Sequence, residues 1–147
     1  MKRMFLFILV VSSILLAACS SPAEPTTVGE GSVGQKVAVS NGSYTDVSVP
    51  ELQTMLEEKD FVFVNVHIPF EGDIPDTDLF VPFDEIDANL NQLPADKDAK
   101  IVLYCRSGNM SSIAAEDLVS RGYTNIWNLA GGFNAWKAAG LPMEGSN

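Results

Sequence analysis

Cysteine and histidine are both scarce in this chain of 147 residues, which contains two cysteines and one histidine. Two cysteines cannot form a framework of several disulfides, so the chain needs an ordinary apolar core. One histidine and one free thiol cannot assemble the usual ligand set of a zinc ion. We therefore expect no metal site, and no residue pattern indicates a cofactor.

Lysine and arginine are also few, because nine basic residues stand against 19 acidic ones and the formal net charge is −10. A chain this acidic repels the phosphate backbone, so we expect no nucleic-acid partner. The same charge would slow the approach of small dianions unless the site focuses positive potential locally. A solvated acidic surface that keeps an exported protein soluble is the simpler interpretation.

Long apolar runs are confined to the N-terminus. Lys2 and Arg3 precede apolar residues that are too few and wrongly flanked for a stable membrane span, a pattern typical of a secretory signal peptide. The residues up to Cys19 resemble the lipobox of bacterial lipoproteins, in which the cysteine is lipidated before cleavage in front of it. The alternative is an ordinary signal peptide that ends near a cysteine.

The composition divides the chain into three predicted parts. Residues 1–18 form the lipoprotein signal peptide, and residues 19–43 form the lipidated Cys19 with a flexible tether that is poor in large apolar groups. Residues 44–147 form one folded domain. We expect lipid on Cys19 to attach the exported protein to the bacterial cell envelope, at the outer face of the cytoplasmic membrane or at the outer membrane.

The pattern of the domain alternates between strands and helices. Apolar runs at residues 61–66 and 101–104 and a run at residues 125–129 predict strands, and residues 79–82 predict a shorter one. Helices are predicted from the capping residue Ser48 to about residue 58, from the capping residue Asp84 to about residue 90, and at residues 111–121 and 133–139. This alternation predicts an α/β domain with a mainly parallel sheet.

Cys105 follows the predicted strand at residues 101–104, at the carboxyl end where α/β sheets carry their sites. If Cys19 carries lipid, Cys105 has no intrachain partner, and an unpaired thiol in an exported protein needs a chemical explanation or deep burial. Backbone N–H groups of the following loop would favour a thiolate, which is the nucleophilic form. The predicted active loop comprises Cys105, Arg106, Ser107, Gly108, Asn109, Met110 and Ser111.

The order of these motifs resembles the rhodanese family. It runs from the strand and the Cys105 loop through Arg121-Gly122-Tyr123 to residues 129–136 and the Gly-Leu-Pro at residues 140–142. The resemblance implies a mainly parallel sheet of about five strands with helices on both faces. It also implies that Cys105 takes a sulfur atom from a small donor such as thiosulfate or a persulfide and holds it as its own persulfide. The sulfur atom then passes to a thiol acceptor such as a thioredoxin-like protein.

Several residues depart from the family pattern. Many members close the loop with arginine, where this chain has Met110, and Arg106 is left either to contact the substrate or to pair with an acid. The usual Asp-Val-Arg is Asn65-Val66-His67, and His67 is either an accessory proton carrier or a structural hydrogen-bonding residue. A catalytically weakened binding or thiol-redox module is therefore the alternative function. Related phosphatases bind an oxyanion with an arginine at the position of Ser111, so this chain fits sulfur transfer better than phosphatase chemistry.

Overall fold

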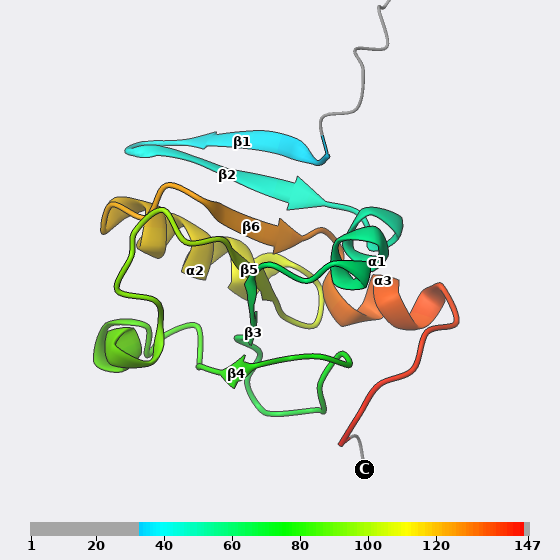
Figure 1. The fold of residues 1–147 in the computed structure, drawn as a ribbon. Helices are drawn as coiled ribbons and strands as arrows, with labels where there is room; N and C mark the ends of the chain where they lie inside the picture. Colours follow the sequence, from blue (N-terminus) through cyan, green and yellow to red (C-terminus); the bar gives the residue numbers. More distant parts are fainter. Residues whose placement is uncertain (1–32, 146–147) are drawn as a thin grey trace, which may run out of the picture. The chain divides into compact units, whose positions relative to one another are not determined.

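The computed structural model describes residues 33–145, which contain one six-stranded sheet in the order β1-β2-β6-β5-β3-β4 (Figure 1). The predicted signal peptide and Cys19 lie outside the described residues. The strands are β1 Gln35–Val39, β2 Gly42–Val47, β3 Val62–Asn65, β4 Leu79–Phe80, β5 Ile101–Tyr104 and β6 Ile126–Leu129. The four neighbouring pairs β2-β6, β6-β5, β5-β3 and β3-β4 are all parallel, which confirms the predicted mainly parallel sheet.

Strand β1 corrects the predicted start of the folded domain at residue 44. Residues 35–39 pair antiparallel with β2, with Val37 opposite Tyr44, so residues 35–43 belong to a hairpin rather than to a tether. Val37 and Val39 are partly buried against the core, and this packing supplies the stability that the short, mostly polar segment lacks.

Helices cover both faces of the sheet, as predicted. The helical elements are α1 Val49–Glu57, the 3-10 helix η1 Asp87–Gln92, α2 Asn109–Ser120 and α3 Gly132–Ala138. Alternate residues of the central strands enter opposite cores: Leu103 packs in the cluster that contains α2 residues, whereas Tyr104 packs in the cluster that contains α1 and α3 residues. No helix within residues 33–145 is long and apolar enough to cross a membrane.

Two helix predictions need correction. Residues 84–90 do not form a helix capped by Asp84; the chain turns at Pro82 to Glu85 and then forms η1. Only Ile86 and Leu90 of this segment pack against the core, which is too little apolar contact to hold a longer helix. Helix α2 begins at Asn109, two residues before the predicted start, because Gly108 adopts a positive φ of 96° and caps it.

Candidate active site

Cys105 lies directly after β5, at the carboxyl end of the parallel strands and at the start of the loop to α2. Its exposed fraction is 1%, and it belongs to the core cluster beneath α2. The loop is short, since α2 begins only four residues later. The structure therefore places a buried thiol beside a helix N-terminus, where backbone N–H groups are free to bind an anion.

Two donors contact the Cys105 sulfur. The backbone N–H of Gly108 lies 3.1 Å from Sγ, and the Ser111 hydroxyl oxygen lies 3.4 Å from Sγ and 3.1 Å from the Gly108 carbonyl oxygen, so its single hydrogen can serve either acceptor. Ser111 is completely buried, so its hydroxyl is a fixed part of the site. A hydrogen bond to a charged sulfur is stronger than one to a neutral sulfur. The site therefore offers hydrogen-bond donors to the sulfur at this position.

The other predicted loop residues lie further out. Ser107 and Asn109 are exposed, and Met110 is partly buried against the core beneath α2. Met110 therefore fills space in the core, and its thioether offers no donor to an anion. The structure joins Cys105, Gly108 and Ser111 into one group and places Arg106 at its solvent side, with 55% of its side chain exposed.

The N-terminus of α3 holds the loop from the other side. The N–H of Phe133 donates to the Cys105 carbonyl at 2.9 Å, and the N–H of Asn134 donates to the Arg106 carbonyl at 3.0 Å. A side chain at Gly132 would overlap the backbone of Cys105 and Arg106. This close approach explains Gly132, and the positive φ of both Gly131 and Gly132 favours glycine at both positions.

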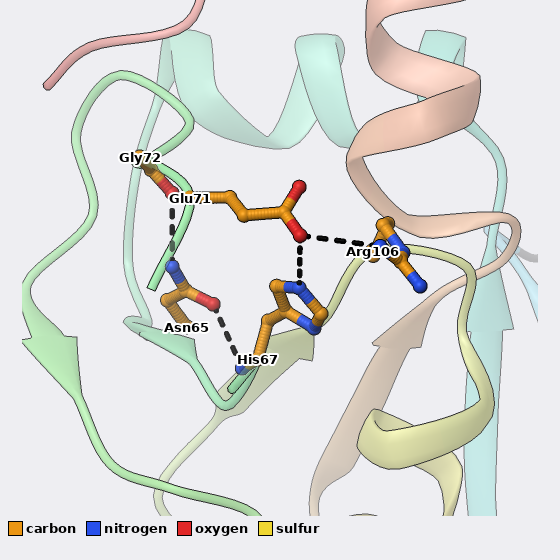
Figure 2. A network of polar contacts seen from close by, with 5 residues as sticks. All are labelled: Asn65, His67, Glu71, Gly72 and Arg106. Carbon is orange, nitrogen blue, oxygen red and sulfur yellow. Dashed lines mark hydrogen bonds and ion pairs between the residues drawn. The ribbon is translucent and has the colours of Figure 1, made fainter. Parts of the chain in front are cut away.

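A second polar network adjoins the loop and centres on Glu71 (Figure 2). One carboxylate oxygen of Glu71 lies 3.1 Å from His67 Nε2 and 3.2 Å from Arg106 Nη1. The bond to His67 holds the pKa of Glu71 below its ordinary value, and the charges of Arg106 and Lys137 add to this effect. Arg106 therefore pairs with an acid, which was one of its two predicted roles.

His67 is buried beside the loop, with an exposed fraction of 2%. Its ring meets the Phe133 ring edge to face at a centroid distance of 5.3 Å, and Phe133 is the residue bonded to the Cys105 carbonyl. Because Glu71 is a carboxylate, Nε2 carries the proton of this pair. Within the described chain, Nδ1 is buried and has no hydrogen-bond partner.

Asn65 fixes the segment that carries His67 and Glu71. Its Oδ1 accepts from the His67 N–H at 3.0 Å, and its Nδ2 donates to the Gly72 carbonyl at 3.1 Å and to Asp73 at 2.9 Å. The buried Tyr104 hydroxyl donates to the same Asp73 oxygen. An aspartate could not make both donations of Asn65, so this departure from the family pattern has a structural reason.

Glu71 was missed by the sequence analysis. Four residues separate it from His67, but this spacing indicates a contact only within a helix, and residues 66–72 are not helical. The one available signal was the expectation that Arg106 could pair with an acid, which required an acidic partner but did not say which residue it was. Within residues 33–145, no group of three or more metal-ligating side chains could hold a metal ion.

Comparison with known sequences identifies relatives of this domain. The model of the rhodanese-like domain family matches residues 48–139. Over 94 residues the chain is 37% identical to a sulfurtransferase of Allochromatium vinosum, and the match covers 62% of this chain and 85% of that relative. Over 50 residues it is 46% identical to a thiosulfate sulfurtransferase of Pseudomonas fluorescens, which covers 34% of this chain and 45% of that relative.

Solved structures show the same fold. A rhodanese-like domain from Anabaena sp. matches with a TM-score of 0.60 at 28% identity, covering 68% of this chain and 78% of the other. A rhodanese-related protein from Thermoplasma volcanium matches with a TM-score of 0.56 at 27% identity, covering 67% and 95% of the two chains. These structures confirm the predicted fold class.

Proposed function

Because the chain belongs to the rhodanese-like domain family, we propose that it is a sulfurtransferase that carries sulfane sulfur as a persulfide on Cys105. Its relatives in Allochromatium vinosum and Pseudomonas fluorescens carry the names sulfurtransferase and thiosulfate sulfurtransferase. The observation that carries the proposal is the pair of donors, Gly108 N–H and Ser111 hydroxyl, on the buried Cys105 sulfur. Such donors stabilise both a thiolate and the terminal sulfur anion of a persulfide.

The proposed reaction has two displacement steps. The Cys105 thiolate attacks the outer sulfur of thiosulfate, a new S–S bond forms, and sulfite leaves with the electron pair of the broken S–S bond. An acceptor thiolate then attacks the outer sulfur of the persulfide and releases the Cys105 thiolate. Only 1% of Cys105 is exposed, so a bulky donor could not bring its outer sulfur to the thiolate. The site therefore suits small donors.

The cellular setting is part of the same proposal. Lipid on Cys19 would anchor the protein to the bacterial cell envelope, and the acceptor would be a thiol protein there, such as a thioredoxin-like protein. The lipobox-like residues before Cys19 support the anchor.

A catalytically weakened binding or thiol-redox module is the second candidate. It is favoured by the packing of Met110 against the core, which leaves the loop without its customary closing cation, and by the pairing of Arg106 with Glu71. In this case Cys105 would react with thiols or bind a ligand but would turn over sulfur donors poorly.

Intact-protein mass after incubation with thiosulfate separates the two candidates. We expect wild type to gain one sulfur, about 32 Da, and to lose it on addition of cyanide or a thiol, while Cys105→Ser gains nothing. The same gain in Cys105→Ser would overturn the assignment of the nucleophile. If Cys105 reacts with a thiol probe but takes up no sulfur, the binding or redox module is the better description.

A further inference from the structure

Glu71 connects the buried part of the site with Arg106, the exposed cation of the Cys105 loop. A single carboxylate oxygen contacts both His67 Nε2, from the buried side, and Arg106 Nη1, from the solvent side. Figure 2 shows the Glu71 side chain reaching from beside Gly72 over His67 toward Arg106, with one carboxylate oxygen facing both residues. The negative charge of Glu71 therefore lies beside the loop that carries Cys105.

The position of Glu71 is held by several buried contacts. Asn65 accepts from the N–H of His67, four residues before Glu71, and donates to the carbonyl of Gly72, the residue after it. His67 is fixed in turn by the Phe133 ring. The backbone around Glu71 is thus held by buried contacts, and its side chain is less exposed than that of Arg106, at 35% against 55%.

This pairing removes the positive charge that a doubly charged donor would need. Arg106 is the only cation among residues 105–111, because Met110 stands at the usual arginine position. The basic side chains that face Glu71 are His67, Arg106 and Lys137, and Lys137 lies over the Phe133 ring at 4.7 Å. Because Glu71 neutralises the charge of Arg106, the solvent side of the site offers little electrostatic attraction to a dianion.

We propose that Glu71 determines donor specificity: by pairing with Arg106 it makes the Cys105 site prefer sulfur donors of low negative charge over dianions such as thiosulfate. The inference rests on the proposed sulfur transfer and adds the class of donor. The attraction to Arg106 that this pairing cancels is proportional to the charge of the ligand, so the effect of Glu71 on a dianion is the square of its effect on a monoanion when both are written as ratios of rate constants.

The test compares two donors that differ by one charge, thiosulfate and methanethiosulfonate. Cys105 displaces sulfite from the first and methanesulfinate from the second by the same breakage of an S–S bond. Glu71→Gln keeps an acceptor for His67 and removes only the charge. We expect kcat/KM to rise about tenfold for thiosulfate and about threefold for methanethiosulfonate, with the gain mainly in KM. High salt should reduce both gains.

Two further variants separate this explanation from others. Glu57→Gln removes the same charge at the end of α1, where Glu57 has no contact with Arg106 or His67, and should leave the ratio between donors unchanged. In an Arg106→Gln background, Glu71→Gln should have a smaller effect, because no cation remains to be released. Equal gains for both donors, or no gain, would overturn the proposal.

A binding measurement keeps the inference distinct from the proposed function. Sulfate, a dianion without a transferable sulfur, should protect Cys105 from alkylation by neutral iodoacetamide more strongly in Glu71→Gln than in wild type. If neither donor forms a persulfide but the protection changes as expected, the proposed function fails and the charge preference stands. If wild type forms the persulfide but protection and donor ratio are unaltered in Glu71→Gln, the charge preference fails alone.

Discussion

At the scale of single residues, Gly132 allows the start of α3 to pack directly against the loop after Cys105. The backbone of α3 touches the loop after Cys105 there, and two hydrogen bonds from Phe133 and Asn134 follow directly. The contact fixes the carbonyl groups of Cys105 and Arg106. It thereby helps to orient the short segment that brings the Gly108 N–H to the Cys105 sulfur.

Replacement of Gly132 should therefore be severe. A Cβ at Gly132 overlaps the Cys105 carbonyl oxygen, and the backbone has a φ of 55°, so Gly132→Ala should cost roughly 3 to 5 kcal/mol of unfolding free energy. Gly122→Ala is the matched control, because its φ is 89° but no atom lies within 4 Å of the added Cβ. We expect the control to lose only about 1 kcal/mol. Equal losses in urea denaturation would contradict the role of the close approach.

At the scale of elements, α1 is joined to the N-terminal hairpin by Glu51. The Glu51 carboxylate accepts from the Ser48 N–H at 2.8 Å, from the Ser48 hydroxyl at 2.7 Å and from the Gly34 N–H at 2.8 Å. These bonds hold the pKa of Glu51 below its ordinary value, with the Ser48 backbone as the largest contributor. Glu51, which completes the helix cap at Ser48, therefore also binds the residue that precedes β1.

The stability contribution of Glu51 should depend on pH. A carboxyl group with a lowered pKa in the folded state stabilises the protein above its ordinary pKa and loses this contribution as pH falls through the folded value. Glu51→Gln should therefore cost about 0.5 to 1 kcal/mol at neutral pH, and the difference from wild type should shrink below about pH 4.5. Glu57→Gln, at the other end of α1, is the control. Thermal melts from pH 7 to pH 3 measure both, and a difference that persists at pH 3 would rule out the carboxylate as its source.

At the scale of the whole molecule, the domain combines a strong negative charge with the predicted lipid anchor. Cleavage before Cys19 would remove Lys2 and Arg3 but no acid, which leaves seven basic and 19 acidic residues and a net charge of −12. Anionic lipid would repel such a domain, so its surface charge does not favour membrane binding and only the predicted covalent anchor would supply it.

The anchor makes a direct prediction for the full chain expressed in bacteria. Cys19→Ala should abolish incorporation of labelled palmitate and processing at residue 18, because the thiol that receives the lipid is missing. Cys105→Ala, the same substitution at the other cysteine, should keep both. Cell fractionation and labelling measure the outcome. Lipid incorporation that persists in Cys19→Ala would exclude Cys19 as the anchor.

Local patterns were sufficient for much of the domain. Short apolar runs bounded by turn residues predicted β3, β5 and β6, and the capping residues at Ser48 predicted α1. The position of Cys105 at the carboxyl end of β5 followed from the same patterns, as did the parallel sheet, whereas the resemblance to the rhodanese family implied the helices on both faces. Periodicity, capping and turn chemistry act over a few residues, which is why the sequence by itself determined these features.

Other features were decided only by the tertiary structure. β1 depends on pairing with β2 and on burial of Val37 and Val39 against the core, and η1 replaces a predicted helix because few of its residues reach that core. Glu71 and Arg106 are 35 residues apart and meet only because their strands, β3 and β5, are neighbours in the sheet. Contacts between distant loops depend on which strands lie side by side, and no local residue pattern contains that information.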